Sequence, residues 1–346
     1  MSVFKVDGGV STVSIYGKYV HKRYNFKYIV GGCSTFPFFL SEICCLNILK
    51  NEQYFPKVLN VDIILNQRKH FTGVRIKMDN LGLPIFRLNG NHMKYFIEIL
   101  KQVKILHEHR ILHGDLKSNN ILIDETGNIH IIDFTHSKIM SDDMTLPYCD
   151  TLLQTPTIMA PEVACGERVL TFKIDIWGLG CVLYDMITGT ELFGTCKNES
   201  DIREELETGE YFDKIDRNIG KERERDLLKF ILREEADKRP CIDDILIYIQ
   251  HTMTPNPQPC ALTYSRSEFA FDYVDEVMNV ILPKNDENVE THNTFNLIAR
   301  CIISALITNE DCYVTDTDKY KIENIIEKLV YIIRTKDVYD CFAEWY

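Results

Sequence analysis

Residues 113–122 read HGDLKSNNIL, and residues 131–135, a short turn later, read IIDFT. The side chains in these two stretches that can act on a phosphate or hold a metal ion are Asp115, Lys117, Asn120 and Asp133. Phosphoryl transfer needs a carboxylate beside the attacking hydroxyl, a cation on the transferred phosphate and oxygen ligands for Mg²⁺. These four side chains together contain all the groups that such chemistry requires.

The two stretches are expected between a helix and a pair of strands. Residues 92–109 carry apolar side chains at helical spacing. Residues 121–123 (ILI) and 129–132 (IHII) read as two short strands, and the turn-rich residues 124–128 join them. The chemistry-bearing loop is therefore predicted to connect a helix to a β-hairpin.

This arrangement resembles the catalytic and metal-binding loops of the eukaryotic protein kinases, whose pattern is H-R-D-x-K-x-x-N followed by D-F-G. The resemblance implies that Asp115 orients the substrate hydroxyl and accepts its proton. It also implies that Lys117 neutralises the γ-phosphate, and that Asn120 and Asp133 hold Mg²⁺. ATP and Mg²⁺ are the cofactors that it predicts.

Small-molecule kinases of the aminoglycoside and choline type share this loop, so the downstream sequence has to decide between the two families. QTPTIMAPE at residues 154–162 resembles the peptide-binding shelf of protein kinases, and KIDIWGLGCVLY at residues 173–184 resembles the buried helix that follows it. In that family a distant arginine pairs with the glutamate of A-P-E. The shelf and structural residues assigned by the resemblance are Thr155, Glu162, Asp175 and Arg239. Thr155 in the shelf favours serine or threonine over tyrosine as the acceptor.

The N-terminal part, residues 1–82, shows short alternating runs that are typical of β-strands. Residues 10–16 and 18–22 flank Gly17, which predicts a tight hairpin. Apolar spacing over Ser41–Leu49 predicts one helix that begins near Ser41.

The nucleotide-binding elements of the kinase family are less complete in this sequence. When Val13 is aligned with the valine that ends G-x-G-x-x-G-x-V, only the central glycine, Gly8, remains, with Gly9 beside it. Such glycines let backbone N–H groups approach phosphates because no Cβ intrudes. Residues 74–81 should form a strand and hinge, with Met78 as the gatekeeper. The residues that the resemblance assigns to ATP binding are Gly8, Gly9, Val13, Lys22, Glu42, Asp79 and Leu81.

Two lysines, Lys22 and Lys27, compete for the place of the family's strand lysine. Lys22 is favoured because SEICCL at residues 41–46 then falls at a suitable distance. This run resembles the R-E-I-x-x-L of the regulatory helix in kinases related to the cyclin-dependent group. On that resemblance, Glu42 pairs with Lys22 and holds it on the α- and β-phosphates.

The sequence departs from the kinase pattern at two positions of the catalytic loops. Gly114 replaces the arginine that binds an activation-segment phosphate in the family, so such control is not expected. Thr135 replaces the glycine of D-F-G, and its β-branched side chain should restrict the backbone there.

The sequence leaves two hypotheses for the function: a serine/threonine kinase that transfers the γ-phosphate of ATP to proteins, and a pseudokinase that acts as a scaffold or allosteric regulator. The first is favoured because the residues that touch phosphate and metal are all present.

Composition limits the partners and the compartment. A formal net charge of −12 argues against nucleic-acid or anionic-membrane binding, which would need a clustered positive field. Twelve scattered cysteines favour free thiols, and no apolar run is long enough for a signal or a membrane span. We therefore expect a cytoplasmic or nuclear protein that is not secreted, with protein substrates.

The predicted fold is α+β and bilobal, with a small antiparallel sheet and one helix over residues 1–82 and a mainly helical part over residues 83–251. Helices are predicted within that part at residues 173–188, 222–233 and 242–250. Three prolines in six residues predict a linker over residues 252–260. Amphipathic spacing predicts an α-helical extension over residues 261–346, in which residues 290–299 faintly resemble a cyclin-box helix. The extension could therefore serve as a built-in activator or bind a regulatory partner.

Overall fold

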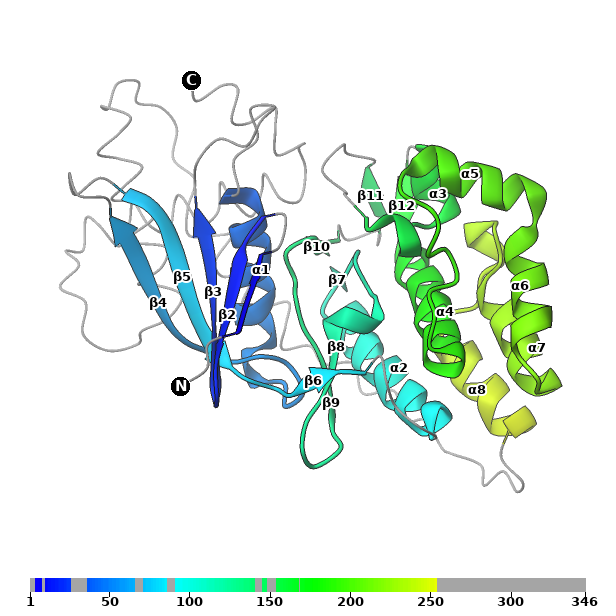
Figure 1. Cartoon of the computed structure of the whole chain (residues 1–346), viewed down its shortest axis with the longest axis horizontal. Helices are drawn as coiled ribbons and strands as arrows, with labels where there is room; N and C mark the ends of the chain where they lie inside the picture. The colour runs from blue at the N-terminus through cyan, green and yellow to red at the C-terminus, as the bar shows by residue number, and fades with distance from the viewer. Residues whose placement is uncertain are drawn as a thin grey trace. The chain divides into compact units, whose positions relative to one another are not determined.

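The described part of the chain consists of two compact units, drawn in colour in Figure 1. The computed structural model describes residues 4–7, 10–25, 36–65, 71–85, 91–140, 145–147, 154–167 and 169–253. The first unit includes the described residues up to Asn80, except Glu52–Phe55, and the second unit includes Glu52–Phe55 and the residues from Leu81 onward. The predicted extension over residues 261–346 lies outside the described residues.

The first unit is an antiparallel sheet with one helix, as the sequence predicts. Its strand order is β1-β2-β3-β5-β4. The strands are β1 (Phe4–Asp7), β2 (Thr12–Tyr16), β3 (Tyr19–Asn25), β4 (Val58–Leu65) and β5 (Phe71–Asp79). The predicted hairpin is confirmed, since β2 and β3 pair around Gly17, whose φ of +61° is one that glycine adopts without strain. Along β3 the side chains alternate, so that Lys22 and Tyr24 are buried while Arg23 is exposed.

The helix of the first unit, α1 (Phe36–Ile48), begins five residues before the predicted start. Ser41 is a residue type that often caps helices, but here it is buried inside the helix. Pro37 stands in the first turn, where a missing N–H costs nothing. Phe39 packs edge-on against Tyr24 with 5.6 Å between ring centroids, so the helix covers the buried face of β3.

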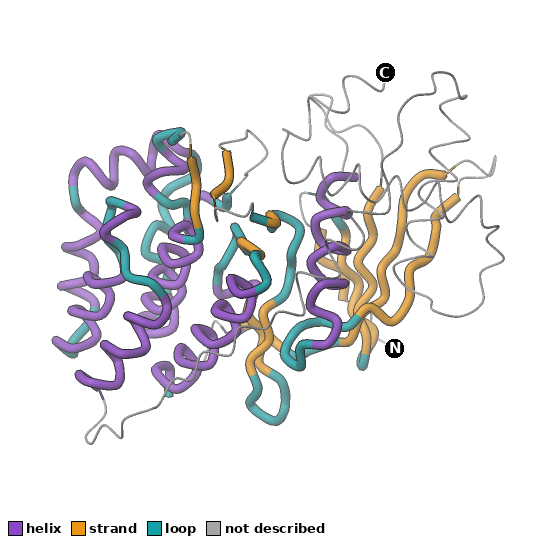
Figure 2. Tube along the Cα trace, turned by 180° about the vertical axis from the view of Figure 1, so that it is seen from behind, coloured by secondary structure: helices purple, strands orange, loops and turns teal. Residues whose placement is uncertain are grey.

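The second unit is mainly helical, which confirms the predicted fold class (Figure 2). Its helices are α2 (His92–Glu108), α3 (Pro161–Ala164), α4 (Lys173–Thr188), α5 (Glu199–Thr208), α6 (Glu210–Asn218), α7 (Glu222–Ile231) and α8 (Ile242–Met253). The last helix runs two residues into the predicted linker. The sequence did not predict α5 and α6, because both carry mostly charged residues and few apolar ones.

Short strands in the second unit frame the two stretches that contain Asp115 and Asp133. The pairs are β8 (Ile121–Ile123) with β9 (Ile129–Ile131) and β6 (Leu83–Pro84), β7 (Ile111–Leu112) with β10 (Lys138–Ile139), and β11 (Thr145–Pro147) with β12 (Val169–Thr171). Helix α4 forms the core behind them, with every residue from Ile174 to Met186 buried. A Cβ on Gly178 of α4 would lie 3.0 Å from the carbonyl oxygen of Leu116. This glycine therefore lets the buried helix approach the loop that contains Asp115.

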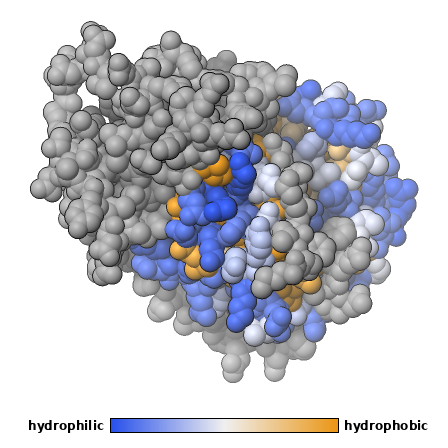
Figure 3. Space-filling model, turned by 60° about the vertical axis from the view of Figure 1, so that its left-hand side comes forward, coloured by the Kyte–Doolittle hydropathy of each residue, from blue (hydrophilic) through white to orange (hydrophobic). Residues whose placement is uncertain are grey.

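The surface of the described part fits the composition. Among the coloured residues on the face drawn in Figure 3, hydrophilic ones prevail, with small apolar patches between them. Among the described helices, none is long and apolar enough to cross a membrane. Each cysteine of the described ranges is a free thiol.

Candidate active site

In the first unit, Lys22 and Glu42 form a buried ion pair. Strand β3 places Lys22 opposite Val13 of β2 and Ile76 of β5, and α1 supplies Glu42. The two side chains are 5% and 2% exposed. Tyr24 Oη donates a second hydrogen bond to Glu42 Oε2 at 2.5 Å. Because the pair is shielded from water, the glutamate fixes the lysine in one place on the sheet.

Of the other residues assigned to the nucleotide, Val13 pairs with Lys22 in the sheet, Asp79 belongs to the first unit and Leu81 to the second. Gly8 and Gly9 fall between β1 and β2, and they and Lys27 are not described. Asp79 ends β5 and Leu81 follows it. Asn80 joins this stretch to the hairpin, with its backbone N–H 3.0 Å from the Lys18 carbonyl and its Nδ2 2.6 Å from that of Gly17.

In the second unit, Asp115 is the centre of a buried hydrogen-bond cluster. Its Oδ1 accepts from Thr155 Oγ1 at 2.6 Å. Its Oδ2 lies 2.7 Å from Lys117 Nζ and accepts from Asn120 Nδ2 at 3.0 Å. Lys117 Nζ also donates to Thr155 Oγ1 at 2.7 Å. Asp115 is 2% exposed, so the three side chains hold its carboxylate in one orientation.

Asp175, in the first turn of α4, holds the loop that carries Asp115. Its carboxylate accepts from the backbone N–H groups of His113 and Gly114, each at 2.9 Å, and lies 2.9 Å from His107 Nε2. Gly114 has a φ of +77°, a left-handed conformation that favours glycine, and its carbonyl accepts from Gln154 Nε2 at 2.9 Å. The glycine that replaces the family's arginine therefore suits the backbone conformation of this loop.

Asn120 and Asp133 stand at the same end of the β8–β9 hairpin. Ile121 pairs with Ile131, and the Ile132 N–H donates to the Asn120 carbonyl at 2.9 Å. Asn120 Nδ2 donates to both the carbonyl and the carboxylate of Asp115, which leaves Asn120 Oδ1 as the acceptor end of the amide. Asp133 has a φ of +67° and its Oδ1 accepts from the Thr135 hydroxyl.

This donor set fits Mg²⁺. The ion prefers carboxylate and amide oxygens and takes only one or two protein carboxylates, with phosphate oxygens and waters as its other ligands. Within the described ranges there is no group of three or more His, Cys, Asp or Glu side chains that could hold a metal ion. Asn120 and Asp133 therefore suit a metal site that a nucleotide completes, and not an all-protein cage.

Glu162 and Arg239 form the second buried ion pair, at the base of the predicted peptide shelf. Arg239 Nη1 and Nη2 each donate to one Glu162 oxygen at 2.7 Å. The remaining guanidinium N–H groups donate to the carbonyls of Arg233, Lys173 and Glu234. All five donors of the guanidinium group thus have acceptors, which satisfies a side chain that is fully shielded from water.

Two supporting residues were not predicted from the sequence. Asp185 of α4 accepts from Ser118 Oγ at 2.8 Å, and burial raises the pKa of the Asp185 carboxyl to about 7. Gln154 bridges Gly114 to the shelf, because its Oε1 accepts from the Ala160 N–H at 3.0 Å. The only sequence signal for Asp185 was a carboxylate in an otherwise apolar helical stretch.

Comparison with known proteins agrees with this geometry. Residues 84–249 match the protein kinase domain family. The chain is 26% identical over 212 residues to serine/threonine-protein kinase Nek9 of Xenopus laevis, a match that covers 60% of this chain and 22% of that protein. It is 30% identical over 216 residues to mitogen-activated protein kinase pmk-1 of Caenorhabditis elegans, covering 60% of this chain and 56% of the relative.

A third relative is serine/threonine-protein kinase polo of Drosophila melanogaster, with 28% identity over 200 residues, 58% of this chain and 33% of that protein. The chain thus spans between 22% and 56% of the length of these three relatives. The loops around Asp115 and Asp133 lie inside the range that matches the family. Residues 84–249 of this chain belong to the protein kinase domain family.

Proposed function

We propose that the chain is an ATP-dependent serine/threonine protein kinase. The observation that carries the proposal is the cluster in which Thr155, Lys117 and Asn120 all bond the carboxylate of Asp115. A fixed carboxylate beside a lysine and an amide is the arrangement that phosphoryl transfer to a hydroxyl requires.

In the proposed reaction, the serine or threonine oxygen of the substrate attacks the γ-phosphorus in line with the bond to the bridging oxygen. That bond breaks, ADP leaves, and the proton of the hydroxyl passes to Asp115. Lys117, which bonds Asp115 and Thr155 in this structure, would place its charge on the transferred phosphoryl group. Catalysis would come from positioning and electrostatics.

The remaining groups would bind the nucleotide and the metal ion. Lys22, held by Glu42, would contact the α- and β-phosphates. Asn120 and Asp133 would hold Mg²⁺, which neutralises charge on the phosphate oxygens when it is bound. Glu162 and Arg239 would fix the shelf on which a peptide lies, next to Thr155. The free thiols of the described cysteines fit a reducing compartment, the cytoplasm or the nucleus.

A radiolabel transfer assay tests the proposal. The full chain is incubated with γ-labelled ATP, Mg²⁺ and a serine/threonine peptide library, beside the Asp133→Ala variant. With the wild type we expect label in serine and threonine peptides. With the variant we expect incorporation to fall by at least about a hundredfold, because a carboxylate that would hold the metal ion in the transition state is removed. Equal incorporation by both proteins would refute the kinase proposal.

One observation favours the alternative of a pseudokinase scaffold. The Thr135 hydroxyl already bonds Asp133 Oδ1, one of the oxygens that would hold the metal ion. A thermal-shift titration separates the two candidates, because a ligand bound by the native state raises the melting temperature. A shift with ATP that does not depend on Mg²⁺, together with no transfer of label, would support the scaffold.

A further inference from the structure

A short segment that interrupts the first unit in sequence belongs to the second unit. Glu52–Phe55 lies between the 3-10 turn Leu49–Asn51 and β4, yet it is part of the second unit. Phe55 is 1% exposed and packs edge-on against Phe134, with 6.1 Å between ring centroids. Phe134 follows Asp133 directly, and its ring also lies 5.3 Å from the His113 ring. The position of this segment therefore bears on both catalytic loops.

His130 of β9 connects this segment to the β8–β9 turn. Its Nδ1 lies 3.0 Å from the Tyr54 carbonyl oxygen, and its Nε2 lies 3.0 Å from Asp124 Oδ2. A carbonyl and a carboxylate can only accept, so both contacts are hydrogen bonds only when both ring nitrogens carry protons. The imidazole side chain is 9% exposed, and water has little access to replace either bond.

Neighbouring hydrogen-bond donors keep the Asp124 carboxylate in its charged form, which favours a cationic partner. Its carboxylate accepts from Thr126 Oγ1 at 2.7 Å and from the N–H groups of Thr126 and Asn128 at 2.8 and 2.9 Å. Hydrogen bonds hold the pKa of the Asp124 carboxyl well below its usual range. The bond from the Thr126 side chain contributes most, and those from His130 and Asn128 add to it. The carboxylate therefore stays charged across the range in which histidine titrates.

The groups on the other side of His130 are neutral. Gln102 of α2 donates to the Ile129 carbonyl at 2.5 Å and accepts from the Ile131 N–H at 3.2 Å, so it fixes the backbone on both sides of His130. From the described elements packed around the ring, Asp124 is the charged group bonded to it and Tyr54 presents a carbonyl. A proton on each ring nitrogen of His130 thus faces an acceptor.

A second histidine contacts the same segment. His109, the residue after α2, has its Nε2 2.9 Å from Glu52 Oε1, with side chains 20% and 34% exposed. This pair is closer to solvent, so it is screened more than the His130 contact. The segment is therefore held at both ends, and more firmly at the buried one.

We propose that His130 is a positioning residue that, as an imidazolium, clasps Tyr54 to Asp124 and so keeps Phe55 against Phe134 beside Asp133. With a neutral ring, one ring nitrogen carries no proton, and its lone pair faces the lone pair of the acceptor oxygen. That hydrogen bond is then lost and the clasp weakens. Histidine is the side chain that changes charge in the physiological range, so the setting of the Asp133 loop becomes sensitive to pH. The catalytic consequence of the clasp rests on the proposed kinase function, but the clasp itself does not.

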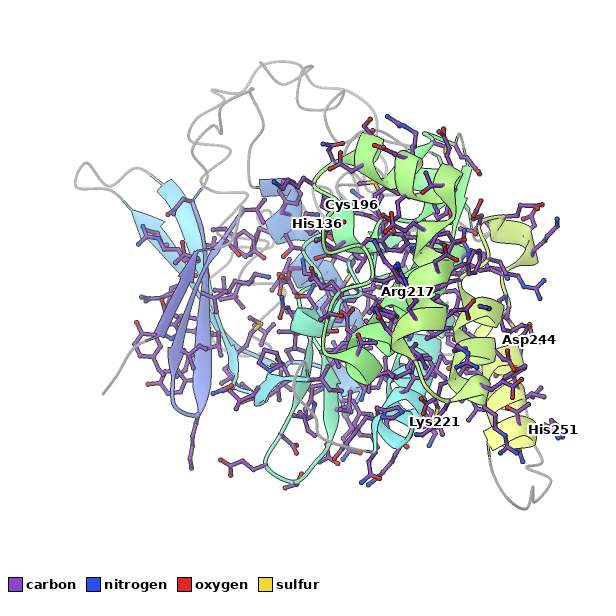
Figure 4. The ribbon with its side chains drawn as sticks, turned by 45° about the vertical axis from the view of Figure 1, so that its right-hand side comes forward. His136, Cys196, Arg217, Lys221, Asp244 and His251 are labelled. Carbon is purple, nitrogen blue, oxygen red and sulfur yellow. The ribbon has the colours of Figure 1, made fainter. Side chains whose placement is uncertain are left out.

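Hydrogen–deuterium exchange on the full chain without nucleotide measures the clasp directly. Protection of the peptides that contain Phe55 and Phe134 is compared at about pH 6 and about pH 8, with intrinsic exchange rates corrected, across the range in which histidine titrates. The variants are His130→Gln, which cannot donate from both positions, and Asp124→Asn, which keeps the turn but removes the charge. His251→Gln is the matched control, because His251 is exposed on α8 (Figure 4).

We expect wild type and His251→Gln to lose protection by about tenfold from the lower to the higher pH, the effect of one hydrogen bond to a charged group. Both clasp variants should show the weaker protection at either pH. A wild type with equal protection at the two pH values, or a His130→Gln protein that keeps the pH dependence, would overturn the proposal. The pH dependence of kcat gives a second measurement of the effect of the clasp on the Asp133 loop. If the chain transfers no phosphate but the exchange pattern holds, the kinase proposal fails while the clasp stands.

Discussion

The hydroxyl of Thr155 donates to the carboxylate of Asp115 at 2.6 Å and joins two segments that are 40 residues apart in sequence. The same hydroxyl accepts from Lys117 Nζ at 2.7 Å. A single side chain therefore orients both the proposed proton acceptor and the proposed phosphate cation. This relationship links the proposed peptide shelf to the proposed chemistry of the loop that contains Asp115.

Replacing Thr155 with valine should lower kcat by about ten- to a hundredfold, because valine keeps the shape but removes the donor to Asp115 and the acceptor for Lys117. The serine variant, which keeps the hydroxyl, should retain most of the activity. Steady-state kinetics with a phosphorylated peptide as product gives both values. Valine and serine variants of equal activity would show that the hydroxyl has no part in catalysis.

Glu42→Gln should weaken ATP binding and lower stability, because Lys22 would be left as a buried charge without its counter-ion. Removing one partner of a buried pair costs about 3–5 kcal/mol in unfolding free energy. Urea denaturation measures the stability and calorimetric titration the affinity. Lys18→Met is the control, since Lys18 lies exposed in the β2–β3 turn. The assignment of Lys22 and Glu42 fails if Glu42→Gln matches this control in both measurements.

Arg239→Lys should destabilise the second unit even though the charge is retained. Lysine offers three donors from one atom and cannot replace five N–H groups that reach Glu162 and three carbonyls. We expect a loss of about 3 kcal/mol or more. Arg217→Lys, on the exposed side of α6 (Figure 4), should change stability little. Comparable denaturation midpoints for the two variants would contradict this role of Arg239.

Asp185→Asn should change how stability depends on pH. Burial raises the folded-state pKa of Asp185 from 3.8 to about 7, so folding favours its protonated form. The contribution of this group is fully present below its ordinary pKa and is lost as pH rises toward about 7. Asparagine can still accept from Ser118 but does not titrate, so the variant should lose less stability over that interval. Thermal unfolding from about pH 4 to about pH 8 measures it, and parallel curves for wild type and variant would exclude the effect.

The structure around the proposed catalytic loops could be predicted from the sequence because their residues are close in the chain. The hairpin from Ile121 to Ile131 and the buried helix α4 carry clear strand and helix patterns, and the structure has both. The predicted start of α1 was wrong because Ser41, a residue type that often caps helices, lies inside the helix. Residue type alone could not distinguish these two places.

The supporting contacts could not be predicted, because they join residues that are distant in sequence and follow no periodic pattern. Ser118 and Asp185 are 67 residues apart, and Tyr54 and His130 are 76 apart. The choice of Lys22 over Lys27 rested on resemblance, and the structure adds the contact between Lys22 and Glu42 that spacing could not supply. Local motifs thus predict which groups do the chemistry, while the packing that orients them follows only from the folded chain.

The most direct test of the account is single-turnover transfer of γ-labelled phosphate from ATP to a serine peptide by wild type and by Asp115→Asn. Asparagine keeps the size of the side chain but cannot accept the proton of the attacking hydroxyl, so we predict a rate at least about a hundredfold lower with ATP affinity unchanged. Transfer at the wild-type rate by Asp115→Asn would contradict the central role assigned to this carboxylate.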